Sequence, residues 1–450
     1  MALDRTSAAP APHGRAPAPG TDVRQRALRA LLAVDEAGYG TQQALRHALN
    51  DPPPLQGADR ALATELVYGV ERRRRPLDAW IEGSCAKGLY PLEAPALAAL
   101  RLGAYQLAYL ERIPDFAAVN ATIDAARAYV PERAIGFVHA VLRTLARRGM
   151  AGDLPVGDDL PPWLRRRVTD LAATLGLDPE ALQSAFRGAA PLHLHAIGPA
   201  AAVESALKAA GVPIEPLADV AIPGVWRSEG GTLFQSEPFA QRQVLAQDAA
   251  SAAVTEWLDV QPDWQVADLA AGRGVKSVAL AAHGAKVTAV DIDAAKLAEA
   301  QRLGETAGYP LHATVVADGA AEMPLPHGQF DAVLLDAPCT GLGTLRRRPE
   351  IRHRRQAADL LRMADLQGRM LVRAADLVKP GGLLLFATCS FAFEEGPHVL
   401  ERFLRNRPEF QRDPGPALWV RPLLDQNGDL RTHPLLAGMD AFFGARLRRS

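Results

Sequence analysis

The sequence predicts a multidomain protein with an all-α N-terminal bundle, a small α/β subdomain, and a C-terminal α/β domain built on a Rossmann-like, doubly wound parallel sheet. Three observations lead to this prediction. At 450 residues the chain is too long for one ordinary hydrophobic core. Apolar residues in its first third repeat at three- and four-residue steps, as in amphipathic helices. From about residue 239 onward, strand-like apolar runs alternate with helical stretches, which is the βαβ pattern of a parallel sheet.

The N-terminal third is expected to be helical behind a disordered tail. Residues 1–20 are rich in Ala, Pro and Gly and lack periodicity, which predicts disorder. Between residues 21 and 150, sets such as Leu62, Leu66 and Val70 fall on one helical face, and no strand-like alternation appears. Prolines at positions 52–54, 91 and 114 separate the helices from one another. This segment is therefore predicted to be an all-α bundle.

The middle of the chain combines a linker with a short mixed segment. Residues 151–162 contain Gly, Asp and Pro, which suits a linker. In residues 163–238 a helix around Trp163–Leu175 precedes short β-like pieces at Leu192–Ile197 and Gly224–Arg227. We expect a small α/β subdomain here.

Residues 239–450 carry the alternating pattern. The expected strands are Trp264–Leu269, Lys286–Ile292, Ala313–Ala317, Phe330–Leu335 and Gly382–Thr388, separated by helices near 276–283, 294–307 and 365–378. Ligands of such sheets bind beyond the carboxyl ends of the strands. The residues that end or closely follow these strands are Asp268, Asp291, Asp318, Asp336 and Cys389.

Composition narrows the class of protein. Apolar residues make up 48% and charged residues 22%, as in a folded, soluble protein. No apolar run approaches the roughly 20 residues that span a bilayer, and the N-terminus lacks a signal pattern. Three cysteines give no complete disulfide framework and no zinc spacing, so we expect reduced thiols, a cytoplasmic location, and neither a metal nor a membrane partner. The net charge of −1 gives no argument for or against nucleic acid.

A ligand site is expected along the first three strands of this sheet. The turn from Asp268 to Lys276 follows a strand, opens a helix and contains Gly272 and Gly274, which let a ligand approach the backbone closely. Asp291 is placed to accept hydrogen bonds from ribose hydroxyls. Each feature alone is compatible with a tight turn or a helix cap, but their order on successive strands favours a ligand. The absence of a full Gly-x-Gly-x-x-Gly pattern disfavours a nicotinamide dehydrogenase.

Two cysteines follow predicted strands in short turns, Asp336-Ala-Pro-Cys339-Thr-Gly341 and Ala387-Thr-Cys389-Ser390. A thiolate is suited to adding across the 5,6 double bond of a pyrimidine, which makes carbon 5 nucleophilic enough to accept a methyl group. The alternative is a small buried apolar residue, the usual state of a free cysteine. We favour that alternative for Cys85, within a predicted helix, but not for Cys339 and Cys389, because a strand end offers little burial.

These motifs resemble a known family. The C-terminal half is similar to the RsmB/Sun and NOP family of RNA cytosine-5 methyltransferases, and the N-terminal half is similar to a NusB domain. The C-terminal resemblance rests on Asp336-Ala-Pro-Cys339-Thr-Gly341-Leu-Gly343-Thr-Leu-Arg346-Arg-Arg-Pro349-Glu-Ile-Arg352, on Ala387-Thr-Cys389-Ser390 with Glu394-Glu395, on Gln247-Asp248-Ala-Ala-Ser251 and on Asp440-Ala-Phe442-Phe443-Gly-Ala-Arg-Leu447. The N-terminal resemblance rests on Arg24-Gln-Arg-Ala-Leu28, Glu65-Leu-Val-Tyr-Gly69-Val, Leu100-Arg-Leu-Gly-Ala-Tyr-Gln-Leu107 and Val119-Asn120-Ala.

The resemblance implies a class I methyltransferase fold in the C-terminal domain, S-adenosylmethionine as cofactor, and RNA as partner. The NusB-like half narrows the expected RNA to the 16S rRNA of the small subunit. The residues expected to bind S-adenosylmethionine are Ala270, Ala271, Gly272, Arg273, Gly274, Val275, Lys276, Asp291, Asp318 and Asp336. Asp318 could reach an exocyclic amino group. Lys276 is expected either to meet the carboxylate of the cofactor or to be a solvated helix residue.

The cofactor loop departs from the family pattern Asp-x-Cys-Ala-Ala-Pro-Gly-Gly-Lys-Thr. The substituted positions are Ala270 for Cys, Gly272 for Ala, Arg273 for Pro and Val275 for the second Gly, whereas Asp268, Ala271, Gly274 and Lys276 are retained. We expect the cofactor still to bind, and the sequence leaves open whether these changes weaken its binding.

The resemblance also implies roles at the reacting base. Cys389 would attack carbon 6 of cytosine, Asp336 would hydrogen-bond nitrogen 3, and Cys339 would assist removal of the carbon 5 proton. The target base would have to leave its stack to reach Cys389. The arginines expected to hold RNA phosphates, with a solvated loop as the alternative, are Arg346, Arg347, Arg348 and Arg352.

Two other functions stay open at this point: a tRNA cytosine-5 methyltransferase, and a non-catalytic RNA-binding or ribosome-assembly factor. The altered cofactor loop is the one feature that favours the second. The sequence gives neither the target nucleotide nor the oligomeric state, nor whether naked rRNA or a ribosomal particle is the substrate.

Overall fold

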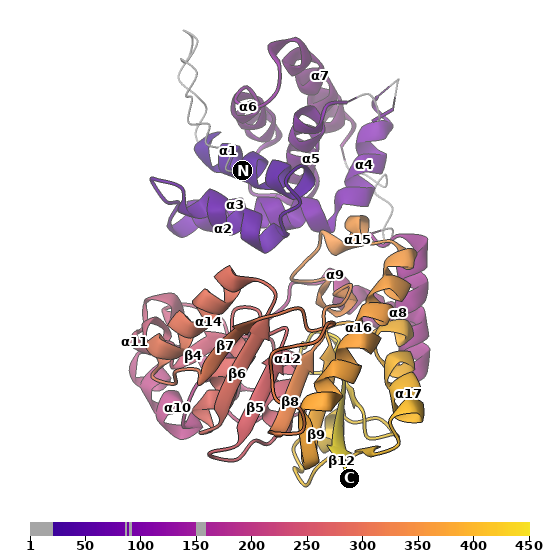
Figure 1. The fold of residues 1–450 in the computed structure, drawn as a ribbon. Helices are drawn as coiled ribbons and strands as arrows, with labels where there is room; N and C mark the ends of the chain where they lie inside the picture. Colours follow the sequence, from indigo (N-terminus) through magenta and orange to yellow (C-terminus); the bar gives the residue numbers. More distant parts are fainter. Residues whose placement is uncertain (1–20, 86–87, 90–91, 150–158) are drawn as a thin grey trace. The chain divides into compact units, whose positions relative to one another are not determined.

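The computed structural model describes residues 21–85, 88–89, 92–149 and 159–450 (Figure 1). The predicted tail at 1–20 and most of the predicted linker lie outside these residues. The chain divides after Leu160 into two compact units, a helical unit and a larger α/β unit. Among the described residues, no helix combines the length and apolarity that a bilayer-spanning segment needs.

The first unit is all-α, as predicted. Its helices are α1 (Thr21–Asp35), α2 (Thr41–Asn50), α3 (Gly57–Arg72), α4 (Arg74–Glu82), α5 (Ala94–Tyr109), α6 (Asp115–Ala126) and α7 (Glu132–Arg148). Helix α5 is buried along most of its length, and its Leu100 and Leu102 are fully buried. Gly103 lets the Leu142 side chain of α7 pack directly against the α5 backbone. Cys85 is a buried member of the same core, as expected.

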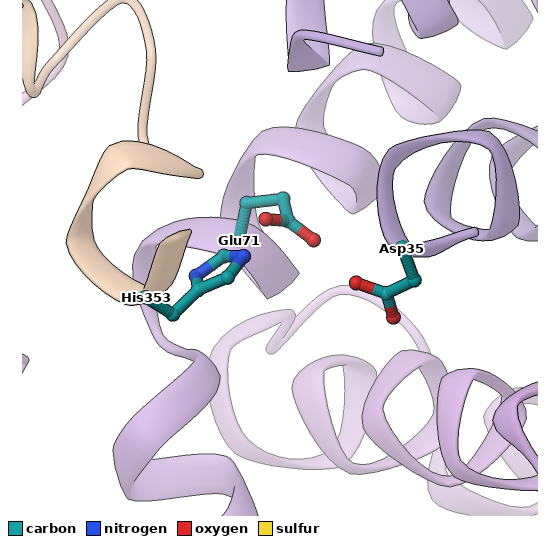
Figure 2. A group of neighbouring side chains, drawn as sticks. All are labelled: Asp35, Glu71 and His353. Carbon is teal, nitrogen blue, oxygen red and sulfur yellow. The ribbon is translucent and has the colours of Figure 1, made fainter. Parts of the chain in front are cut away.

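Ion pairs join the helices of this unit. Asp35 of α1 accepts hydrogen bonds from Arg74 at 2.5 Å and from Arg101 at 3.4 Å. Arg101 also donates two hydrogen bonds to Asp78, at 2.6 and 2.8 Å. Figure 2 shows Asp35 on α1 and Glu71 on α3; its third labelled residue, His353, belongs to the second unit. Arg74 and Arg101 therefore hold helices of this unit together.

The second unit begins with a small antiparallel sheet, in the order β2-β3-β1-β4. The helices and strands of this part of the second unit are α8 (Pro162–Leu175), α9 (Pro179–Arg187), β1 (Leu192–Ala196), α10 (Ala200–Ala209), β2 (Ile214–Pro216), β3 (Val225–Ser228), the 3₁₀ turn η1 (Leu233–Gln235), α11 (Glu237–Ala240) and β4 (Val244–Ala246). The sheet therefore extends past the predicted boundary at residue 238, because β4 pairs with β1.

The large sheet lies in residues 265–449, all of which the structure describes, in the order β10-β12-β9-β8-β5-β6-β7. Its elements and their helices are α12 (Ala249–Trp257), β5 (Gln265–Leu269), α13 (Val275–Ala282), β6 (Lys286–Asp291), α14 (Ala294–Ala307), β7 (Ala313–Val316), β8 (Phe330–Asp336), η2 (Leu342–Thr344), α15 (Ile351–Arg354), α16 (Ala357–Leu377), β9 (Val378–Thr388), η3 (Phe393–Glu395), α17 (Pro397–Asn406), β10 (Phe410–Arg412), η4 (Arg421–Leu423), β11 (Leu430–Arg431) and β12 (Phe443–Arg449).

Strands β5 to β9 are parallel, and β12 runs antiparallel to β9. Alternate residues of β8 enter two different cores: Leu334 packs on one face of the sheet and Val333 on the other. A parallel sheet buried on both faces explains why these strands read as continuous apolar runs. Figure 1 shows helix α16 in front of strands β8 and β9, which it contacts. The doubly wound fold predicted from the sequence is confirmed.

Helix α16 begins eight residues earlier than the predicted start at 365. A capping box explains this, because Gln356 and Asp359 satisfy each other's backbone N–H groups at the helix start.

Candidate active site

The two cysteines meet at the carboxyl ends of neighbouring strands. Asp336 ends β8 and lies opposite Ala387 of β9, so the loops that follow leave the sheet side by side. The Sγ atoms of Cys339 and Cys389 are 3.2 Å apart, and both thiols are free. The hydrogen bond with Cys389, and then burial, raise the pKa of Cys339 well above its usual value. Cys339 is therefore held as a neutral thiol at neutral pH.

Backbone hydrogen bonds join the two loops to each other and to the segment around Ala441. The Ala337 N–H donates to the Ala387 carbonyl at 2.8 Å, and the Gly343 N–H donates to the Cys389 carbonyl at 3.0 Å. The Gly343 carbonyl in turn accepts from the Ala441 N–H at 3.1 Å. A Cβ on Gly343 would lie 1.7 Å from the Ala441 carbonyl oxygen, so only glycine fits there.

A buried ion pair lies beside the cysteines. Lys276, in the first turn of α13, places its Nζ 2.6 Å from Oδ2 of Asp336. Burial alone would lower the pKa of Lys276, but the Asp336 carboxylate raises it above the usual value, with smaller contributions from Asp268 and Cys389. Lys276 is therefore a charged member of the site and not a solvated surface residue.

The predicted cofactor turn encloses a cavity. Ala270, Gly272 and Gly274 all have positive φ, of 58°, 57° and 78°. The Gly272 N–H donates to Oδ2 of Asp291 at 2.8 Å, which ties the turn to the end of β6. The cavity measures about 280 Å³, close to the lower end of ligand pockets. It is lined by Ala246, Gln247, Ser251, Asp268, Ala270, Ala271, Arg273, Val275, Lys276 and Asp336.

Asp268 is one of the residues that line this cavity and is 1% exposed. Its Oδ2 accepts a hydrogen bond from the Ser277 hydroxyl at 2.5 Å. Burial raises the pKa of Asp268 to about 7, against the lowering effect of Ser277 and Lys276.

Exposed apolar side chains flank the acidic strand ends. Ile292 follows Asp291 and is 70% exposed, and Val316 at the end of β7 is 58% exposed. Asp318, two residues further on, is exposed and accepts a hydrogen bond from the Ala320 N–H. Two apolar surfaces beside two carboxylates suit a flat heteroaromatic ring joined to a sugar, so the residues fit S-adenosylmethionine. Sequence reasoning missed Ile292 and Val316, although each stands beside a predicted acidic residue.

The predicted RNA-binding arginines separate into two groups. Arg346 is buried and donates to the Gly438 carbonyl and, at 3.1 Å, to Asp440. Arg347 pairs with Asp440 at 3.0 Å and with Asp248 at 2.7 Å. Both guanidinium groups bind the segment around Asp440, so the phosphate contacts predicted for them would compete with these ion pairs.

Arg348 and Arg352 differ from this pair. The Arg348 side chain is 45% exposed, with its Nε 3.5 Å from Glu350. Arg352 donates to the Phe186 carbonyl of α9 at 2.8 Å. The phosphate-binding role expected of this run therefore suits Arg348 best.

An open, mostly parallel sheet with a glycine turn over a cavity, acidic strand ends and a lysine–aspartate pair is typical of Rossmann-like methyltransferases. A sequence model described as 16S rRNA methyltransferase RsmB/F matches residues 255–448, and one for the NusB family matches residues 21–147. The chain belongs to the RsmB/F family of rRNA methyltransferases and carries an N-terminal NusB domain.

Relatives cover nearly the whole chain. The probable ribosomal RNA small subunit methyltransferase B of Bacillus subtilis is 30% identical over 95% of this chain and 99% of its own length. The ribosomal RNA small subunit methyltransferase B of Thermus thermophilus is 34% identical over 95% of this chain and 97% of its own. The crystal structure of PH0851 is similar in fold, with a TM-score of 0.79 and 24% identity over 97% of this chain and 100% of that one.

Proposed function

We propose that the protein is an S-adenosylmethionine-dependent RNA cytosine-5 methyltransferase that acts on 16S rRNA through a covalent bond between Cys389 and the target cytosine. The observation that carries the proposal is the pair of free thiols 3.2 Å apart. This pair lies beside the Lys276–Asp336 ion pair, which also lines the cavity of the glycine turn. Membership of the rRNA methyltransferase family supports the general reaction and the substrate class.

The cavity, together with the strand ends of β6 and β7 outside its lining, would hold the cofactor. Asp291 would accept hydrogen bonds from ribose hydroxyls, while Ile292 and Val316 would cover the faces of the adenine. The turn from Ala270 to Lys276 would surround the amino acid end. When bound, S-adenosylmethionine supplies an electrophilic methyl group on a positively charged sulfur.

The chain's own groups then account for the chemistry on the base. The Cys389 sulfur adds to carbon 6 as its thiol proton passes to the Asp336 carboxylate. Asp336 gives that proton to nitrogen 3, which takes up the displaced electron pair. Lys276 keeps Asp336 oriented through its ion pair. After methyl transfer, loss of the carbon 5 proton lets the carbon 6–sulfur bond break and restores the aromatic ring. Cys339 would accept that proton as a thiolate, after its own proton has left to solvent, and its raised pKa makes this thiolate a strong base.

A denaturing gel tests the division of labour between the thiols. Cys339→Ala should accumulate a covalent protein–RNA adduct that survives denaturation, because the bond at Cys389 forms but breaks slowly. Cys389→Ala should give no adduct. The proposed covalent route fails if Cys339→Ala turns over normally, or if the adduct persists in Cys389→Ala.

Two further measurements address the other functions. Calorimetric titration should show S-adenosylmethionine binding; its absence would favour a non-catalytic RNA-binding factor. Bisulfite sequencing of RNA from a deletion strain should show a lost 5-methylcytosine in 16S rRNA. A loss confined to tRNA would instead identify a tRNA methyltransferase.

A further inference from the structure

Glu395 connects the two cysteine loops through one buried carboxylate. Its Oε1 accepts a hydrogen bond from the Thr340 N–H at 2.6 Å, next to Cys339. Its Oε2 accepts from the Ser390 hydroxyl at 2.6 Å, next to Cys389, and also from the Thr340 hydroxyl. Glu395 itself is fully buried. The residue that follows each cysteine is thus bound to the same side chain.

Other contacts act on the same loops. Gln367 of α16 donates to the Pro338 carbonyl at 2.9 Å, and Arg355 donates to the Thr340 carbonyl at 3.2 Å, so both hold the Cys339 loop alone. The Gly343 N–H, in the same loop as Cys339, binds the Cys389 carbonyl and joins the two loops through their backbones. The Glu395 carboxylate adds a side-chain link between them, bound to the residue that directly follows each cysteine.

The burial of this carboxylate has a cost that its hydrogen bonds only partly offset. Burial raises the pKa of Glu395 despite hydrogen bonds from Ser390 and Thr340. A buried carboxyl group without a directly bonded cation is expensive to retain, and a non-polar residue would fill the space more cheaply. A carboxylate placed between the two cysteine loops and bound to both of them indicates a positional role.

We propose that Glu395 is a positioning residue that sets the separation of the Cys339 and Cys389 sulfurs and thereby coordinates adduct formation with product release. The catalytic part of this inference rests on the proposed function. The positional part concerns only the two sulfurs and is testable without RNA.

The distance between the sulfurs can be measured by their oxidation with diamide. Each disulfide releases two electrons and two protons from the thiols, which reduce the N=N bond of one diamide molecule to a hydrazine. In a Cys85→Ala background, the wild-type site should close the Cys339–Cys389 disulfide readily. Glu395→Ala should slow closure by about tenfold or more, because disulfide formation requires close and well-oriented sulfurs.

The neighbouring glutamate supplies a matched control. Glu394 pairs with Arg167 of α8 and binds neither cysteine loop, so Glu394→Ala should close the disulfide at the wild-type rate. Glu395→Gln should lie between wild type and Glu395→Ala, because its amide oxygen still accepts from Thr340. A folded Glu395→Ala variant that oxidises at the wild-type rate overturns the proposal.

Single-loop variants keep the proposal testable if Glu395→Ala does not fold. Ser390→Ala removes the hydrogen bond between the Cys389 loop and Glu395. Thr340→Val removes one of the two hydrogen bonds between the Cys339 loop and Glu395. Slower disulfide closure in either variant supports the proposal, and wild-type rates in both refute it.

A kinetic readout then connects position with catalysis. Glu395→Gln should reduce turnover more than it reduces the rate of adduct formation, so that adduct accumulates on a denaturing gel as in Cys339→Ala. Equal losses in both rates would mean that Glu395 acts only on folding. If diamide closure responds as expected but no variant forms an adduct, the positional role stands and the proposed covalent function fails.

Discussion

The cofactor turn and the cysteine loops occupy the same edge of the sheet but are built differently. The turn from Asp268 to Lys276 keeps its shape through backbone conformation, with three residues at positive φ and one hydrogen bond to Asp291. The cysteine loops keep theirs through side chains and tight contacts, including the Glu395 carboxylate and the Gly343 backbone.

This difference explains which sequence changes the site tolerates. The turn has lost several side chains of the family pattern, yet it still encloses a cavity, because backbone N–H groups and space are independent of those side chains. In the cysteine loops the reacting atoms are themselves side chains, spaced by other side chains. We therefore expect substitutions to cost far more at the cysteine loops than at the turn.

The sharpest test of this contrast is Cys389→Ala. It should lower methylation by about 10⁴-fold or more, as expected when a covalent nucleophile is removed, while leaving the cofactor affinity unchanged. Radiolabelled methyl transfer and calorimetry measure the two quantities. Cys85→Ala, in the core of the helical unit, should retain methyl transfer; substantial residual activity in Cys389→Ala would remove Cys389 from the nucleophilic role.

Gly343→Ala should damage the same region without touching a reacting atom. The added Cβ would overlap the Ala441 carbonyl and crowd the Cys389 carbonyl, which lies 3.0 Å from it. We expect a loss of roughly 3 kcal/mol in the free energy of unfolding and about 100-fold in turnover. Chemical denaturation and methylation assays measure these effects.

Gly136→Ala is the control for that substitution, because nothing lies within 4 Å of its Cβ in α7. It should be neutral or slightly stabilising. Equal effects at the two positions would contradict the crowding argument.

Within the cofactor turn, Gly274 and Gly272 form a matched pair. Both have positive φ, but a Cβ at Gly274 would lie 2.4 Å from the Ala300 Cβ, whereas at Gly272 the nearest atom is 3.9 Å away. Gly272→Ala should cost about 1 kcal/mol of stability from backbone strain alone. Gly274→Ala should cost roughly 2–3 kcal/mol, because overpacking is added. Denaturant titrations of both variants decide this, and equal losses would refute the steric difference.

Local patterns were sufficient for the fold and for the position of the site. Strand periodicity placed Asp268, Asp291 and Cys389 at strand ends, and parallel strands bring such ends to one edge. The glycine turn was recognisable because its residue types permit conformations that others avoid.

The pairings within the site were not predictable, because they join distant segments. Arg347 reads as a basic loop residue, yet its carboxylate partners, Asp248 and Asp440, lie 99 and 93 residues away. Lys276 and Asp336 were each expected to act separately, but they form an ion pair although they lie 60 residues apart in the sequence. Glu395 was noted only as part of a motif, and its link between the loops was not predictable because its three donors come from two different loops.

The smallest expected effect concerns pH and compares a carboxyl group from each region. Burial raises the pKa of Asp268 to about 7 in the folded protein, above the unfolded value of about 4. Between these two values the folded state binds more protons than the unfolded state, so the contribution of Asp268 to stability falls as pH rises from about 4 to about 7. Asp268→Asn should remove this fall, since its amide oxygen still accepts from Ser277. Urea denaturation at several pH values within this window measures the difference in slope.

A second variant sharpens that comparison. Glu395→Gln should flatten the slope less than Asp268→Asn does. The reason is the number of donors: Asp268 receives one side-chain hydrogen bond, and Glu395 receives three hydrogen bonds that stabilise its charged form. If Glu395→Gln changes the slope more than Asp268→Asn does, the charged form of Glu395 is the less stabilised of the two carboxylates. Its larger number of hydrogen bonds would then not stabilise its charge as expected.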